Sequence, residues 1–162
     1  MIHTLKQKNM RTILSTVLVL HILGGMAQNV EADLLALNAH FIGTATFAID
    51  RDDKLITEYT SKGEAYRVDQ VYIEFLAPST CMHNAEENTV MLQCNSDNAK
   101  CIDKEIRKSG VISQTGRINL PTPAGDPNGA KAIELLTALV NDVQAEQRTS
   151  DTGTKKKDKR KK

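Results

Sequence analysis

Residues 121–144 read PTPAGDPNGAKAIELLTALVNDVQ, and this stretch decides the fold class. Within it, apolar residues recur every three or four positions, which is the spacing of an amphipathic helix, whereas upstream of it they alternate as in half-buried strands. Asp126 and Pro127 suit the N-cap and the first position of a helix. The sequence therefore predicts a C-terminal helix that starts near Asp126. Its apolar stripe consists of Ala132, Ile133, Leu136, Leu139, Val140 and Val143.

The region upstream predicts a short helix over residues 31–40 and then about six antiparallel strands. The alternation changes phase at Asp69 and Gln70, which predicts a bulge or a break, and Pro78 ends that strand. Two of the strands flank a six-residue polar loop and predict a hairpin. The strands are predicted over residues 41–49, 55–60, 66–75, 89–94, 101–106 and 111–120.

These elements describe an α+β fold: an antiparallel sheet or roll of about six strands, followed by one amphipathic helix. The order of elements resembles that of pleckstrin-homology-like domains, in which a C-terminal helix caps an open barrel. The resemblance concerns the fold, and a fold does not dictate a function.

The first 28 residues predict export. Lys6, Lys8 and Arg11 precede an apolar run over residues 13–23, and small residues flank Met26 before Gln28. This order is typical of a secretory signal. The run is too short to cross about 30 Å of hydrocarbon as a helix, which needs about 20 apolar residues. We therefore expect a signal peptide over residues 1–27, a mature chain without a membrane span, and a periplasmic or secreted location.

Charge divides the mature chain into one domain over residues 28–147 and a disordered basic tail over residues 148–162. Residues 28–154 hold 11 basic and 19 acidic residues, a net charge of −8, whereas residues 155–162 hold seven basic and one acidic residue. The acidic body makes nucleic acid an unexpected partner, and the tail could bind an anionic envelope surface. The alternative is a solubilising tail that contacts its own acidic body. The tail's basic residues are Lys155, Lys156, Lys157, Lys159, Arg160, Lys161 and Lys162.

Three cysteines follow the predicted signal, so an oxidising compartment predicts one disulfide and one unpaired thiol. Cys94 and Cys101 flank the polar loop and are the favoured pair. One observation opposes this pairing. In its strand, Cys94 falls on the same face as the apolar residue Leu92, whereas Cys101 falls on the opposite face from the apolar residue Ile102. A bulge, or a bond on the solvent face of the hairpin, would reconcile the two. Cys81 would then be free or would bridge two copies.

The segment from residue 88 to residue 143 resembles a known group of proteins. A strand ending in Leu92-Gln93-Cys94, a polar loop, Cys101-Ile102 and a terminal helix is similar to small exported proteins of Bacteroidetes bacteria, whose role is generally unassigned. The resemblance implies a periplasmic or secreted location and does not indicate any particular activity.

Two metal sites compete with these interpretations. Cys81, His83, Cys94 and Cys101 are a possible zinc set by residue type, but they lack the paired Cys-x-x-Cys spacing of structural zinc sites. The acidic residues within 50–53 resemble the start of a calcium loop, but the next ligand position holds a lysine and the loop glycine is missing. A hairpin turn is the favoured reading of residues 50–53.

The sequence contains no Gly-x-Ser-x-Gly, His-Glu-x-x-His or glycine-rich phosphate motif. We therefore expect an exported, non-catalytic binding or accessory domain that needs no cofactor and whose partner is an unknown protein or small ligand. One rival is an envelope-surface tether that acts through the basic tail. The other is a small hydrolase in which His83 meets a carboxylate. We expect His40 to lie at the end of a helix or at the edge of a hairpin.

Overall fold

The computed structural model describes the backbone of residues 29–158 and the side chains of residues 29–150. The fold is α+β, as predicted, and the described residues form eight strands rather than about six. A 3-10 turn, η1, occupies Ile73–Phe75. The strands are β1 (Ala45–Ile49), β2 (Lys54–Ser61), β3 (Glu64–Tyr72), β4 (Leu76–Asn84), β5 (Thr89–Cys94), β6 (Ile102–Ile106), β7 (Val111–Thr115) and β8 (Arg117–Pro121).

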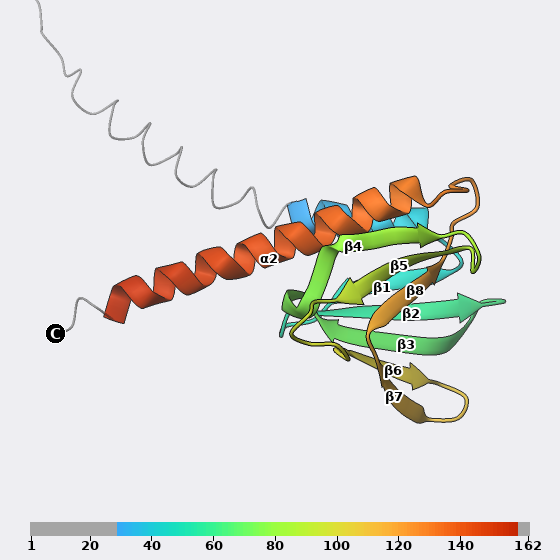
Figure 1. The fold of residues 1–162 in the computed structure, drawn as a ribbon, viewed down its shortest axis with the longest axis horizontal. Coiled ribbons are helices and arrows are strands. Elements are labelled where there is room, and N and C mark those ends of the chain that lie inside the picture. Colours follow the sequence, from blue (N-terminus) through green and yellow to red (C-terminus); the bar gives the residue numbers. More distant parts are fainter. Residues whose placement is uncertain (1–28, 159–162) are drawn as a thin grey trace, which may run out of the picture.

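The strands make two antiparallel sheets whose members alternate along the chain. The larger sheet has the order β1-β2-β3-β6-β7, and the smaller has the order β4-β5-β8. The chain therefore leaves the larger sheet after β3, returns to it at β6, and leaves it again after β7. Figure 1 shows the smaller sheet lying between α2 and most of the larger sheet.

Two helices pack on the sheets. Residues 29–40 are helical, as predicted, and α2 spans Ala130–Asp158. In Figure 1, α2 lies along β4 and extends past the sheets toward its C-terminal end. The amide of Gln144 donates to the carbonyls of Ile73 and Leu76, both at 2.9 Å, and so ties α2 to η1.

The start of α2 differs from the prediction. Gly129 adopts a positive φ of 61°, and its N–H donates to the carbonyl of Asp126, so residues 126–129 form a turn and the helix begins at Ala130. Asp126 still caps the helix with its side chain, because its carboxylate accepts from the backbone N–H of Ala132 at 2.9 Å and of Lys131 at 3.3 Å. The capping chemistry was therefore identified at the right residue, but Pro127 is not the first helical residue.

The far end of α2 also lies further along the chain than the apolar stripe indicates. The helix continues to Asp158 and so includes residues 148–158 of the predicted tail. Residues 159–162 lie outside the described part of the chain, as do residues 1–28 with the predicted signal and its cleavage site. The disorder of the tail and the removal of the signal therefore stay predictions.

One apolar core joins both sheets and both helices. The predicted helical stripe is confirmed, since Ala132, Leu136, Leu139, Val140 and Val143 are buried and Ile133 is partly buried. The alternation in β1 is confirmed as well, although residues 41–44 form a turn and the strand begins at Ala45. Burial of this aliphatic set supplies the main driving force for folding. The other buried apolar side chains include Leu37, Phe41, Phe47, Leu55, Ile73, Leu92, Ile102 and Ile118.

The sequence missed β4. Pro78 does not end a strand but lies inside β4, and the preceding run is instead broken by η1. The bulge or break predicted at Asp69 and Gln70 is also absent, because β3 runs unbroken through both residues and its register with β2 shifts between Tyr59 and Thr60 instead. The alternation of apolar and polar residues changes phase here because the neighbouring residues Val68 and Asp69, which lie on opposite faces of β3, are both buried.

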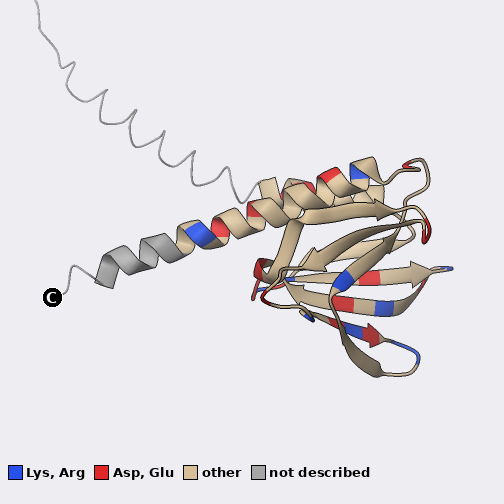
Figure 2. Ribbon diagram, in the orientation of Figure 1, with Lys and Arg blue, Asp and Glu red and all other residues tan. Residues whose placement is uncertain are grey.

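The predicted hairpin of residues 89–94 and 101–106 is wrong. β5 pairs with β4 and β8 in the smaller sheet, whereas β6 pairs with β3 and β7 in the larger one. The predicted strand over residues 111–120 is in fact two strands, and Gly116 marks the point where the chain passes from one sheet to the other. Figure 2 shows that the loop between β6 and β7 carries basic residues.

Candidate functional site

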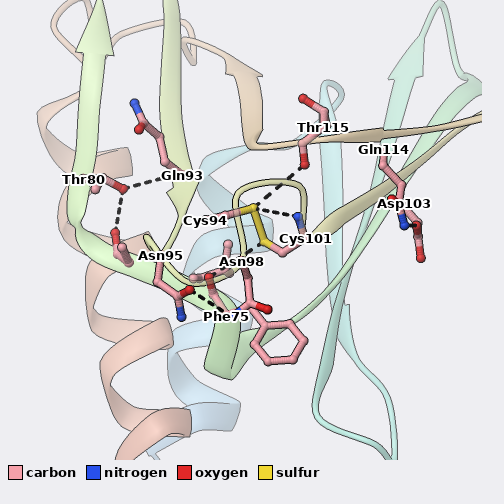
Figure 3. The surroundings of a disulfide bond; sticks show 12 residues. Phe75, Thr80, Gln93, Cys94, Asn95, Asn98, Cys101, Asp103, Gln114 and Thr115 are labelled. Carbon is pink, nitrogen blue, oxygen red and sulfur yellow. Dashed lines mark hydrogen bonds between the residues drawn. A yellow bond between two sulfur atoms is a disulfide. The ribbon is translucent and has the colours of Figure 1, made fainter.

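Three connections between the sheets meet at one end of the molecule. They are η1 between β3 and β4, the loop over residues 95–101 between β5 and β6, and Gly116 between β7 and β8. The backbone N–H of Asn95 donates to the carbonyl of Phe75 at 2.7 Å, and that of Cys94 donates to the carbonyl of Gly116 at 2.9 Å. Each connection is therefore hydrogen-bonded to another, and we call this region the sheet junction (Figure 3).

A disulfide between Cys94 and Cys101 lies within the sheet junction, with Cα atoms 5.9 Å apart. The predicted pairing is confirmed, but the bond joins the last residue of β5, in one sheet, to the residue that precedes β6, in the other. The backbone N–H of Cys101 contacts Sγ of Cys94 at 3.1 Å. The mismatch in strand parity thus reflects a crossover between sheets, and neither a bulge nor a solvent-facing bond is needed to explain it.

Gly116 is required at the sheet junction for steric reasons. A Cβ atom placed on Gly116 would lie 2.4 Å from the carbonyl oxygen of Ala99. This distance is far below van der Waals contact, and the atom met is backbone, so a side chain at this position would force two connections apart. Because residue 116 has no side chain, the connection between β7 and β8 can pack directly against the loop over residues 95–101, which the disulfide closes.

A polar hollow of about 570 Å³ opens beside the disulfide, and we call it the junction pocket. Arg117 supplies its one charged side chain, which pairs with Glu87 at 3.4 Å, and both partners are nearly half exposed. An exposed pair of this kind is weak, at about 0–1 kcal/mol, so the guanidinium can exchange Glu87 for another acceptor. The lining residues are Gln93, Cys94, Asn95, Ser96, Ala99, Thr115, Gly116 and Arg117.

Hydrogen bonds to neighbouring residues hold the groups that line the junction pocket in place. The amide of Asn95 donates to the carbonyl of Glu74 at 3.3 Å and accepts from the amide of Asn98 at 3.0 Å. The backbone N–H of Gln93 donates to the hydroxyl of Thr80 at 3.0 Å. No carboxylate is among the lining residues, although the body carries net negative charge. The hollow therefore suits a ligand that accepts hydrogen bonds.

A second hollow, of about 460 Å³, lies where α2 passes η1 and the turn before β2. Its wall is acidic and includes Asp52, Asp53, Glu74 and Glu146. Among the described residues, however, no three His, Cys, Asp or Glu side chains are arranged to hold a metal ion. The turn over residues 50–53 is a hairpin turn as predicted, in which the Asp50 carboxylate accepts from two backbone N–H groups at 2.9 Å.

The structure does not assemble the possible zinc set. Cys94 and Cys101 are bonded to each other and offer no thiolate. Cys81 packs against the core, and burial raises the pKa of its thiol to about 11, despite a hydrogen bond with Thr137 that acts in the opposite direction. The imidazole of His83 lies close to Gly129, since a Cβ atom placed on that glycine would be 3.4 Å from its Cδ2. Its Nε2 is buried without a hydrogen-bond partner, and it lines neither hollow.

His40 is the last residue of the N-terminal helix, as predicted, and its Nε2 lies 3.0 Å from Oδ2 of Asp126. Burial alone would raise the pKa of Asp126. Hydrogen bonds from the Ala132 N–H, His40 and the Lys131 N–H outweigh that effect and lower the pKa of this carboxyl. The pair joins the N-terminal helix to the start of α2, so both residues have a structural role.

Sequence reasoning missed a buried polar network on the larger sheet. Arg67 donates through Nε to Asp69 at 2.7 Å and also through Nη2, and the hydroxyl of Tyr59 donates to Asp69 at 3.0 Å. The guanidinium stacks on the Tyr59 ring at 4.2 Å. Burial and the Asp69 charge raise the pKa of Tyr59 well above its ordinary value. The phase change at Asp69 was the available signal, because a carboxylate on an apolar strand face requires a partner.

Within the described residues, no helix is long and apolar enough to span a bilayer. The disulfide is compatible with a location outside the cytoplasm. Comparisons with protein-family models, with curated proteins and with solved structures returned no match. The resemblance to pleckstrin-homology-like domains therefore stays one of element order, and the function has to be argued from the geometry.

Proposed function

We propose that this chain is an exported, non-catalytic binding domain whose ligand site is the junction pocket. The observation that carries the proposal is the lining of that pocket. Its side chains offer the Arg117 guanidinium, two amides and two hydroxyls, and no carboxylate, in a body that is otherwise acidic. A ligand with a carboxylate or with several neutral acceptor oxygens matches these donors.

The surroundings of the pocket favour binding over catalysis. The disulfide and the hydrogen bonds of the sheet junction hold the walls in place, which reduces the entropy lost on binding. The residues that could start acid–base or nucleophilic chemistry are used elsewhere: His40 pairs with Asp126, and the Cys81 thiol is half-buried against the core. The small-hydrolase alternative gains nothing from His83, which does not line the pocket.

A thermal-shift screen of the secreted protein tests this proposal. The probes are short mono- and dicarboxylates, a free-carboxylate tripeptide with its amidated form, and common disaccharides. We expect at least one of these classes to raise the melting temperature, and the rise to be lost in Arg117→Met. Lys131→Met is the matched control, because Lys131 is also an exposed cation in an ion pair, with Glu134 at 2.7 Å.

Mass spectrometry of the ligand after incubation checks that it is returned unchanged. Failure of every probe class to stabilise the unmodified protein would contradict the proposed site, and equal losses in both variants would show a general charge effect. Conversion of the ligand would contradict the non-catalytic role.

A second candidate function is the envelope-surface tether, and the length of α2 favours it. The helix runs unbroken to Asp158 and extends past the sheets, so that the backbone of residues 155–158 lies away from the acidic body (Figure 1). Each basic residue near an anionic leaflet contributes about 1 kcal/mol of attraction. Co-sedimentation with phosphatidylglycerol vesicles, at low and high salt, should show retention of the full chain and loss of a variant ending at Thr154. Equal retention of the two would contradict the tether.

A further inference from the structure

Arg117, the charged residue of the junction pocket, also makes contacts outside the pocket. It lies on β8 with Asn119, on the face of the smaller sheet opposite to the buried residues Ile118 and Leu120. Nη2 of Arg117 donates to Oε1 of Glu87 at 3.4 Å, and the side-chain amide of Asn119 donates to Oε2 of the same carboxylate at 3.1 Å. Arg117 and Asn119, which we call the β8 donor pair, therefore already hold one carboxylate.

The turn between β4 and β5 places Glu87 for this contact. The side-chain oxygen of Asn84 accepts from the backbone N–H groups of Glu86 and Glu87, at 3.0 Å and 3.3 Å. At the other end of the turn, the carbonyl of Asn88 accepts from the backbone N–H of Thr122 at 3.1 Å. Because the turn is anchored at both ends, the Glu87 carboxylate has a high effective concentration at the β8 donor pair.

The contact can nevertheless be displaced. The side chains of Arg117 and Glu87 are 47% and 45% exposed, and an exposed ion pair contributes little because water and salt screen it. Nη1 of Arg117 lies 3.7 Å from Sδ of the buried Met91, so the guanidinium has a contact that does not depend on Glu87. A carboxylate from solution can therefore replace Glu87 at Nη2 while Nη1 keeps its contact with Met91.

We propose that the ligand of the junction pocket is a carboxylate, and that Glu87 is its internal competitor for Arg117. While Glu87 holds the guanidinium, a ligand binds only by displacing it. A neutral oxygen is a weaker partner for a guanidinium than the Glu87 carboxylate is, so the competitor discriminates against uncharged ligands. This inference rests on the proposed function, because it names the ligand class and the regulation of the same site.

Two substitutions at Glu87 test the competitor role. Glu87→Gln removes the negative charge, whereas Glu87→Asp keeps the charge but withdraws the carboxylate from both donors by shortening the side chain. Glu134→Gln is the matched control, because Glu134 is also an exposed acid in an ion pair, with Lys131 at 2.7 Å on α2.

The first measurement needs no ligand. Phenylglyoxal modifies accessible guanidinium groups, and peptide mapping by mass spectrometry reports the rate at Arg117 alone. We expect this rate to rise about two- to fivefold in both Glu87 variants, which is the range that an exposed ion pair allows, and to stay unchanged in Glu134→Gln. An unchanged rate in the Glu87 variants, or a rise in Glu87→Gln alone, would overturn the competitor role.

The second measurement is an NMR titration with succinate, with a tripeptide in its free-carboxylate and amidated forms, and with a neutral disaccharide. We expect the free carboxylates to bind about two- to fivefold more tightly to both Glu87 variants than to the unmodified protein, with no such gain for the uncharged probes. Tighter binding of the amidated peptide or the disaccharide than of the free carboxylates would overturn the ligand class. Faster modification of Arg117 without binding of any probe would contradict the junction pocket as a ligand site, while the contact between Glu87 and Arg117 would stand.

Discussion

Breaking the Cys94–Cys101 bond should destabilise the domain by an amount that the structure sets. The bond closes a ring over a sequence separation of seven residues. Loop-closure entropy for so short a ring corresponds to about 2.4 kcal/mol at 25 °C. For a domain of roughly 120 residues this corresponds to a fall in melting temperature of about 7–12 °C. The effect is modest because the ring is short, although the bond connects two sheets.

The cleanest comparison uses one polypeptide in two redox states. Cys81→Ala leaves only the bonded pair of cysteines, so its oxidised and reduced forms differ in a single covalent bond. Urea unfolding of the two forms gives the difference in unfolding free energy. Native-state amide exchange should show the extra opening concentrated at Asn95 and Cys94, whose backbone hydrogen bonds hold the sheet junction together.

A difference below about 0.5 kcal/mol would refute the reasoning, because the ring would then not restrict the unfolded chain. A difference well above 5 kcal/mol would refute it in another way, since the bond would then be holding the sheets together rather than restricting a loop.

Three further predictions concern single residues. Asp69→Asn leaves the Arg67 guanidinium, whose side chain is 13% exposed, without its carboxylate, so urea unfolding should show a loss of about 3 kcal/mol, and a loss under 1 kcal/mol would contradict the network. The pKa of Asp126 is lowered on folding, so the stability that this carboxylate contributes is present above pH 3.8 and is lost as the pH falls through the lower pKa of the folded state. Asp126→Asn should therefore reduce the loss of unfolding free energy at acidic pH. An unchanged loss would show that this carboxyl is not its source. Cys81, with a pKa of about 11, should react with iodoacetamide at pH 8 at least about tenfold more slowly in the native protein than in urea, and equal rates would contradict its burial.

Local patterns in the sequence predicted the parts of the fold that depend on local structure. The helical stripe of Ala132 to Val143, the alternation around Phe47 and the turn at Asp50 each arise from neighbours in sequence, and each is present in the structure. β4 was missed because Leu76–Asn84 shows no alternation and contains Pro78, which an edge strand tolerates.

Pairing between distant strands could not be read in the same way. β5 and β6 are joined by a short polar loop, and the two strands of a hairpin are joined in the same way. The one sign that the chain instead crosses from one sheet to the other was that Cys94 and Cys101 fall on different faces of their strands. Gly116 likewise carried the signal that residues 111–120 are two strands, since a glycine inside a strand often marks a close backbone approach. The junction pocket was unpredictable because its lining comes from two segments that are distant in sequence, residues 93–99 and 115–117.

The alternation of the two sheets along the chain has a consequence for how this protein can be divided. A cut in any loop from β3 to β8 leaves each fragment with an incomplete share of at least one sheet, since β6 needs β3 and β8 needs β5. We therefore expect no fragment to be stable alone and unfolding to occur in one cooperative step. A protease that nicks one such loop would release two halves that hold their shape only while they stay together.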